Sequence, residues 1–119
     1  MKTTLIILAT TLVLAACGGG GDDGSCNVTY EVTGNNTQQR VLITMAPPAG
    51  PALQGTFSVW PNAHREEYKF KTGDFLYISG QNSNSWNAGF TVRILVDGVV
   101  KASNEAAGYS VATAESVCN

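Results

Sequence analysis

The feature that most constrains this chain is an alternation of apolar and polar residues with a period of two. The alternation is clearest in "VTYEV" at residues 28–32 and in "FTVRILV" at residues 90–96, and shorter copies occur at 41–45, 57–59 and 67–71. Because successive side chains of a strand point to opposite faces of a sheet, each copy predicts a half-buried strand. No stretch beyond the N-terminal segment shows the period of an amphipathic helix.

Turn-forming residues separate these stretches. Glycine, proline, asparagine or aspartate occurs in every gap, and the gaps lie at residues 34–36, 47–51, 60–62, 72–74, 81–84 and 97–98. The strongest signal is Asp97-Gly98, because a two-residue type I′ turn needs positive φ at both positions and fits the twist of a hairpin. About seven short strands at this spacing predict an all-β fold, namely an antiparallel β-sandwich.

Residues 1–16 have the pattern of a bacterial lipoprotein signal peptide. Lys2 precedes an apolar run that ends in "LAAC" at residues 14–17, and this ending resembles the lipobox, whose cysteine receives diacylglycerol. The run is too short to span a membrane. Cys17 is therefore predicted to be the lipidation site, where two or three acyl chains such as palmitate would make a stable anchor. An ordinary signal peptide with a chance cysteine is the alternative.

Residues 17–25 are predicted to be a flexible tether between the lipid and the domain. The string "GGGGDDGS" at 18–25 has no apolar side chain, so it cannot bury enough surface to fold. Gly18 rather than aspartate follows Cys17, which disfavours retention in the inner membrane. We therefore expect a lipid-anchored protein of the bacterial cell envelope at the outer membrane, on either its periplasmic or its cell-surface side.

Two further cysteines, Cys26 and Cys118, remain once Cys17 is assigned to lipid. An exported chain allows disulfides, and two cysteines allow a single pairing. The bond would join the first strand to the last and close a loop of about 90 residues, which in loop-closure terms stabilises by about 4 to 5 kcal/mol. Two free thiols are the alternative.

Residues 26–119 are long enough for one domain with one core. The whole chain has 7 lysines and arginines against 9 aspartates and glutamates, for a net charge of −2. Nucleic-acid binding depends on clustered lysine and arginine, so this balance indicates no nucleic-acid partner.

The order of segments in residues 28–118 resembles the MmpS family, which are small membrane-anchored partners of MmpL exporters of the RND type, and its free-standing lipoprotein relatives. The similarity lies in "VTYEVTG", "VLIT", "FLYISGQN", "TVRILVDGVV" and the closing "GYSVATA". The resemblance implies an immunoglobulin-like β-sandwich and a role beside a membrane transporter. Two departures are the order Trp60-Pro61, where the family often has Pro-Trp, and a lipobox in place of a transmembrane helix.

No residue pattern in the chain predicts catalysis. His64 is the single histidine and is expected in a solvated loop, whereas a zinc site needs three or four ligands at defined spacing. Glu66 and Glu67 are adjacent, so on a strand they point to opposite faces and cannot work as a carboxylate pair. A Gly-x-Ser-x-Gly elbow and a phosphate-binding glycine loop are missing from the sequence. We therefore expect no enzyme, no metal and no cofactor.

The candidate binding residues lie in "QNSNSWNAG" at 81–89. Trp86 is the one large ring in this loop, where an exposed indole is suited to contact with a partner. Three amides of the same loop could bond sugar hydroxyls or a protein, namely Asn82, Asn84 and Asn87. The alternative is that Trp86 folds back over the end of the sandwich. Trp60 is expected to pack in the core or at an edge, and the proline loop 47–51 is the second candidate surface.

Two functions follow from these expectations. The first is a non-catalytic lipoprotein that scaffolds or supports an RND or MmpL-type transporter or another envelope protein. The second is a surface-exposed module that binds carbohydrate or mediates adhesion.

Overall fold

The computed structural model describes residues 24–119, and this part of the chain contains eight strands and no helix. The strands are β2 (Ser25–Gly34), β3 (Arg40–Met45), β4 (Leu53–Ser58), β5 (His64–Lys71), β6 (Phe75–Asn82), β7 (Gly89–Val96), β8 (Val99–Ala107) and β9 (Ala112–Val117). The predicted all-β class is confirmed, with eight strands in place of about seven. Cys17, the signal peptide at 1–16 and nearly all of the tether at 17–25 lie outside the described residues.

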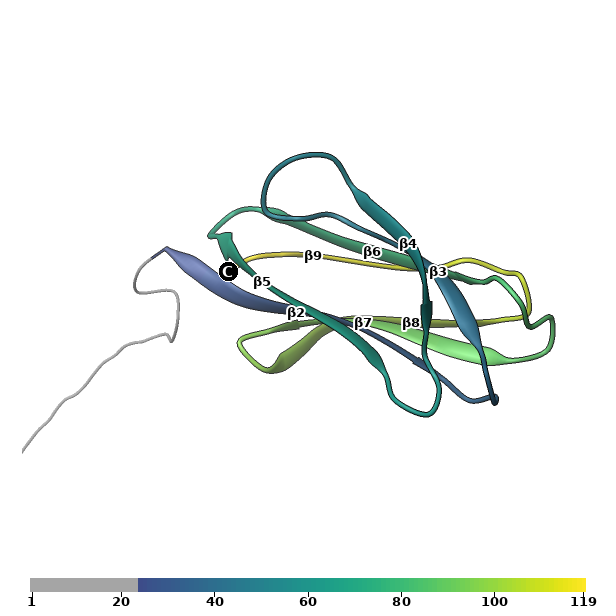
Figure 1. Ribbon diagram of the computed structural model, residues 1–119. Coiled ribbons are helices and arrows are strands. Elements are labelled where there is room, and N and C mark those ends of the chain that lie inside the picture. Colours follow the sequence, from purple (N-terminus) through teal and green to yellow (C-terminus); the bar gives the residue numbers. More distant parts are fainter. Residues whose placement is uncertain (1–23) are drawn as a thin grey trace, which may run out of the picture.

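The strands form two four-stranded antiparallel sheets that face each other as a β-sandwich (Figure 1). The first sheet has the order β5-β2-β7-β8 and the second has the order β4-β3-β6-β9. The immunoglobulin-like part of the expectation is not confirmed. In an immunoglobulin constant domain the first strand lies at a sheet edge, whereas β2 is central here and pairs with both β5 and β7.

The core lies between the two sheets and is built by the alternation seen in the sequence. Along β6, for example, Leu76 and Ile78 are buried while Phe75 and Tyr77 turn outward. The same pattern in the other inner strands fills one continuous cluster, whose largest fully buried side chains include Tyr30, Phe70, Ile43, Met45 and Ile94. The hydroxyl of Tyr30 donates to the carbonyl oxygen of Ala46 at 2.7 Å, so its polar atom is satisfied inside the core.

The predicted Asp97-Gly98 turn joins β7 to β8. Asp97 has a φ of 50° and Gly98 a φ of 84°, as a type I′ turn requires. The Asp97 carboxylate accepts a hydrogen bond from the backbone N–H of Asn27 at 2.9 Å, which fixes the turn to the start of β2. The register between β7 and β8 shifts between Ile94 and Leu95, so a bulge follows the turn closely.

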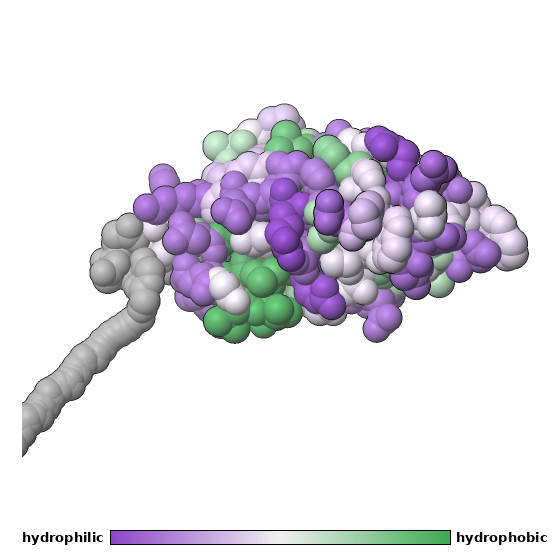
Figure 2. Space-filling model, turned by 60° about the horizontal axis from the view of Figure 1, so that its bottom comes forward, coloured by the Kyte–Doolittle hydropathy of each residue, from purple (hydrophilic) through white to green (hydrophobic). Residues whose placement is uncertain are grey.

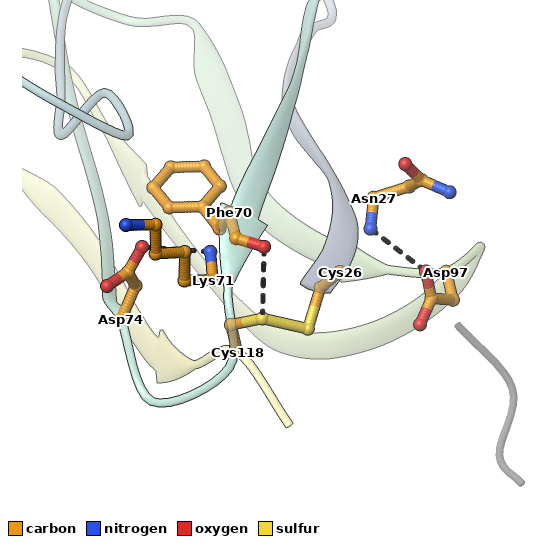
Figure 3. The surroundings of a disulfide bond; sticks show 7 residues. All are labelled: Cys26, Asn27, Phe70, Lys71, Asp74, Asp97 and Cys118. Carbon is orange, nitrogen blue, oxygen red and sulfur yellow. Dashed lines mark hydrogen bonds between the residues drawn. A yellow bond between two sulfur atoms is a disulfide. The ribbon is translucent and has the colours of Figure 1, made fainter. Parts of the chain in front are cut away.

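The predicted disulfide between Cys26 and Cys118 is present, with the two Cα atoms 5.9 Å apart (Figure 3). Cys26 is the second residue of β2, and Cys118 directly follows β9, which belongs to the other sheet. Both cysteines are buried, and the Phe70 carbonyl oxygen lies 3.8 Å from the Cys118 sulfur. The bond therefore connects the two sheets inside the core.

The large apolar side chains that remain exposed lie at the two ends of the sandwich. One end carries the loops 35–39, 59–63, 83–88 and 108–111, and we call it the aromatic end. The opposite end, where β2 begins, carries the loops 46–52, 72–74 and 97–98, and we call it the lysine end. The exposed residues at the aromatic end are Trp60, Trp86, Tyr109 and Val111, and those at the lysine end are Leu53, Phe75, Val99, Val100 and Val117.

Candidate functional site

The aromatic end is the candidate functional site, because it brings together three exposed rings from three different loops. Trp86 is 72% exposed, Tyr109 is 54% exposed and Trp60 is 38% exposed. The antiparallel register places their loops at one end, since the last residues of β2, β4, β6 and β8 and the first residues of β3, β5, β7 and β9 meet there. With 72% of its surface exposed, Trp86 does not fold back over the end of the sandwich.

Asn82 supports this end from inside and does not face a ligand. It is 3% exposed, and its amide nitrogen donates to the carbonyl oxygens of Ala88 at 2.9 Å and Gly108 at 2.8 Å. Its side-chain oxygen accepts from the Gln39 amide at 2.6 Å. The expectation that Asn82 offers its amide to a partner does not fit this arrangement, because every polar atom of the side chain is engaged within the domain.

Gln39 is the second buried amide and was not noticed in the sequence. Its oxygen accepts hydrogen bonds from the backbone N–H groups of Asn35 at 2.9 Å and Asn36 at 3.2 Å, and its nitrogen also donates to the Gly89 carbonyl at 3.1 Å. Together with Asn82 it ties the loops 35–39, 83–88 and 108–111 to one another. Hydrogen bonds are stronger in the low-dielectric interior, so a fully bonded pair of buried amides fixes the arrangement of these loops.

Asn84 and Asn87 lie at the surface of the same loop. The Asn84 oxygen accepts from the backbone N–H of Arg40 at 2.9 Å, and its nitrogen donates to the Gln38 carbonyl at 3.0 Å. Asn84 thus holds loop 83–88 against the segment that leads into β3. Asn87 is exposed and lies 3.4 Å from the Ser85 hydroxyl, so of the three predicted amides it is the one best placed to meet a partner.

Trp60 lies in the loop between β4 and β5 and borders two open hollows. The first hollow, of ≈ 480 Å³, is lined by Trp60, Pro61 and residues 62–65, with Ser58. The second, of ≈ 540 Å³, is lined by Trp60 together with Arg40 and Asn84, among others. Trp60 is 38% exposed and follows the last paired residue of β4, Ser58, so of the two expected positions the core is excluded.

A second polar cluster lies on the inward face of β5. The Nε2 atom of His64 lies 2.9 Å from a carboxylate oxygen of Glu66, and the Tyr68 hydroxyl donates to the same carboxylate at 2.8 Å. The His64 ring stacks on Phe57 of β4 with centroids 4.0 Å apart. His64 is therefore half-buried at the start of a strand and not in a solvated loop. His64, Glu66 and Tyr68 occur at every second position, and on a strand this spacing places their side chains on one face.

Burial of Tyr68 and its contacts with Glu66 raise the pKa of the phenol to about 12. Desolvation is the largest cause, followed by the hydrogen bond to Glu66 and the repulsion between that carboxylate and a phenolate. The pKa of Tyr30 is also raised by burial. Glu67 points to the opposite face of β5, as predicted, so the cluster holds one carboxylate and no second one beside it.

Glu31 is a buried carboxylate on the outer face of the first sheet. It is 8% exposed, and it forms ion pairs with Arg65 at 2.7 Å and Arg93 at 3.1 Å, which come from the neighbouring strands β5 and β7. Register pairs Glu31 with both arginines, so all three side chains lie in one row across the sheet. The row lies across three adjacent strands on the outer face of this sheet.

Among residues 24–119 no group of three or more histidines, cysteines, aspartates or glutamates is placed to hold a metal ion. The same residues contain no helix that is long and apolar enough to cross a membrane. No protein-family model matches the chain, and a search of curated proteins also gives no match.

Proposed function

We propose that this chain is a non-catalytic, lipid-anchored protein of the bacterial envelope that binds a protein partner through its aromatic end. The observation behind the proposal is the Trp86 indole, 72% exposed on a loop whose backbone is held by Asn82. A large ring on a pre-organised loop loses little entropy on binding, and tryptophan is among the residues that most often dominate an interface.

The position of this end supports a role as an accessory or scaffolding subunit. The aromatic end lies opposite the start of β2, so a tether that enters at Ser25 would present Trp86 away from the membrane. The resemblance to the MmpS family favours a transporter of the RND or MmpL type as the partner. The proposal places the protein at the outer membrane, with Cys17 as the lipidation site.

The partner is tested by crosslinking and pull-down from intact envelopes. We expect a transporter subunit to be recovered with wild type and not with Trp86→Ala, whose affinity should fall by about 2 kcal/mol, or roughly thirtyfold. Glu115→Ala, an exposed residue of β9 outside the aromatic end, is the control and should behave as wild type. Equal recovery with all three proteins would contradict the proposed surface.

The anchor is tested separately by Cys17→Ser. The variant should stay unprocessed or be released in soluble form, because no lipid can then be attached. Detergent partitioning and mass measurement of both forms distinguish these states. A variant that remains in the membrane fraction with the wild-type mass would exclude lipidation at Cys17.

A carbohydrate ligand is the second candidate function, and the hollow beside Trp60 favours it. An aromatic ring there adjoins Arg40 and Asn84, so a sugar could stack on the ring and meet hydrogen-bonding groups. Affinity electrophoresis in gels that contain envelope polysaccharide tests this function. Retardation that is lost in Trp60→Ala and kept in Trp86→Ala would favour the glycan over the protein partner.

A further inference from the structure

The lysine end carries a second apolar surface, separate from the aromatic end. Phe75 and Val117 are paired directly across β6 and β9, Val99 and Val100 begin β8, and Leu53 begins β4. All five side chains are exposed. Figure 2 shows an apolar patch on the face near this end of the domain. Single exposed apolar residues are normal, but several at one end of a small domain indicate a contact surface.

The loop 46–52 extends this surface without adding charge. Its sequence "APPAGPA" has no charged side chain and no side-chain hydrogen-bonding group, and it leads directly into Leu53. Residues 48–52 are all exposed. Proline fixes the backbone and removes N–H donors, so the loop has fewer polar groups to desolvate than an ordinary loop of this length.

All lysines between residues 24 and 119 lie at the same end. Lys69 and Lys71 are in the last three residues of β5, and Lys101 is the third residue of β8. The acidic side chains of the two turns, Asp74 and Asp97, each direct an oxygen at a backbone N–H, and the exposed Glu115, in the last three residues of β9, also lies at this end. Asp74 accepts from the N–H of Lys71, and Asp97 from that of Asn27, as Figure 3 shows. Asp74 and Asp97 thus hold the turns at 72–74 and 97–98 in place.

The chain before Ser25 limits how far this end can be from a lipid attached at Cys17. Eight Cα-to-Cα steps separate residues 17 and 25, so the separation is at most about 30 Å even in a fully extended chain. A lipid at Cys17 would therefore hold the lysine end within this distance of the bilayer. Apolar residues with lysines at the same end of a domain can bind the boundary between headgroups and acyl chains, with the lysine stems along apolar groups and the ammonium groups at the polar side.

We propose that the lysine end docks on the surface of the lipid bilayer. The occupant of the apolar surface is lipid, with the valines, Phe75 and the proline loop at the acyl boundary and the lysines at headgroup phosphates. Docking of this end sets the long strands upright on the membrane and directs the aromatic end outward. The inference rests on the proposed lipid anchor.

Tryptophan fluorescence in vesicles tests the docking with the full lipoprotein. The chain has two tryptophans, Trp60 and Trp86, both at the aromatic end. The first reporter carries Phe75→Trp with both native tryptophans changed to phenylalanine, and the second carries Trp60→Phe alone. Both are reconstituted into vesicles of phosphatidylethanolamine and phosphatidylglycerol that contain brominated phosphatidylcholine, a short-range quencher. Circular dichroism checks that each reporter folds.

We expect the indole at position 75 to lose most of its fluorescence on brominated vesicles and Trp86 to keep it. Flotation of the vesicles reports the anchor independently. Protein that floats but is quenched equally weakly at both positions would overturn docking and leave the anchor intact. The apolar surface at the lysine end would then not contact lipid. Quenching at Trp86 alone would reverse the orientation and overturn the proposal. Protein that does not float would overturn both the anchor and the docking.

A pair of variants tests whether the apolar residues are responsible. Val99→Ser with Val100→Ser, in the position-75 reporter, should reduce the quenching because the β8 residues no longer favour the acyl boundary. Val111→Ser is the matched control, since Val111 is an equally exposed valine at the aromatic end. Unchanged quenching in the double variant would show that these valines do not contact lipid and would overturn the assignment of this surface.

Discussion

A Cβ atom on Gly108 would lie 2.7 Å from the carbonyl oxygen of Trp86, so these two residues touch with no room for a side chain between them. Gly108 has a φ of 62°, and its N–H donates to the Ala88 carbonyl at 3.1 Å. The loop 83–88 therefore rests on the loop 108–111, with the indole pointing to solvent and the backbone fixed. Gly108 therefore sets the position of Trp86, the proposed binding residue.

Gly108→Ala should both destabilise the domain and weaken partner binding. The positive φ alone costs about 1 to 2 kcal/mol for a non-glycine residue, and the contact with Trp86 adds to this and displaces its loop. Gly50→Ala is the control, because Gly50 also has positive φ but a Cβ atom there would meet nothing within 4 Å. Chemical denaturation and partner affinity should separate the two variants. Equal losses in both would show that the contact has no effect.

Asn82→Ala should lower the free energy of unfolding by about 3 kcal/mol, because it removes three hydrogen bonds of a buried amide. The Gly108 carbonyl oxygen loses this partner, while the Ala88 carbonyl keeps the Gly108 N–H and the Gln39 amide keeps the Gly89 carbonyl. Asn87→Ala is the matched control and should change stability by less than about 0.5 kcal/mol, as exposed substitutions do. If Asn82→Ala changed stability as little as Asn87→Ala does, water would have taken over the hydrogen bonds of the Asn82 amide.

The sequence predicted the strands and the disulfide because both depend on local signals and on cysteine count. It could not predict which strands pair. The contacts of β2 with β5 and β7 join residues far apart in the chain, and nothing local specifies them. The burial of Asn82 had a signal that was overlooked: it continues the inward series Leu76, Ile78 and Gly80 along β6.

The exposure of Trp60 and the pairing of Glu31 were not predictable in the same way. Whether Trp60 is packed depends on the residue at which the pairing of β4 with β3 ends. That residue is Ser58, only two positions before Trp60. The burial of Glu31 depends on strand register, since Arg65 and Arg93 reach it from two neighbouring strands. A shift of one residue in either pairing would turn the arginine to the other face of the sheet.

Removal of the disulfide by Cys26→Ala with Cys118→Ala should lower the free energy of unfolding by about 2 to 5 kcal/mol, since the cross-link restricts the unfolded chain. The two cysteines are 92 residues apart, so the closed loop contains almost the whole domain. Chemical denaturation of the variant and of reduced wild type should give similar midpoints. A variant as stable as the oxidised protein would show that the cross-link contributes nothing.

Stability should fall as the pH rises from about 10 towards 12, in part because of Tyr68. Its pKa is about 12 in the folded protein and about 10 in the unfolded chain. Between these values the unfolded chain loses a proton that the folded protein keeps, so a rising pH favours unfolding. Below pH 10 the contribution is fully present. Tyr68→Phe should show a shallower loss of stability with pH than wild type.

Glu66→Gln should lower the pKa of Tyr68, because it removes the carboxylate that repels the phenolate. Part of the shift should remain, since burial is its largest cause. Glu67→Gln is the matched control, as Glu67 lies on the opposite face of β5. Alkaline titration of phenolate absorbance in the two variants measures the effect, and identical curves would exclude a role for Glu66.

The central place of β2 has a mechanical consequence. Tension applied through the chain before Ser25 enters a strand that is hydrogen-bonded on both sides, to β5 from Ser25 to Val32 and to β7 from Val28 to Gly34. Antiparallel bonds lie across the strand direction, so a pull along β2 shears them together and does not unzip them one at a time. One residue further on, Cys26 passes part of the tension by a covalent bond to the end of β9. A partner that moves while gripping the aromatic end would thus pull on both sheets at once.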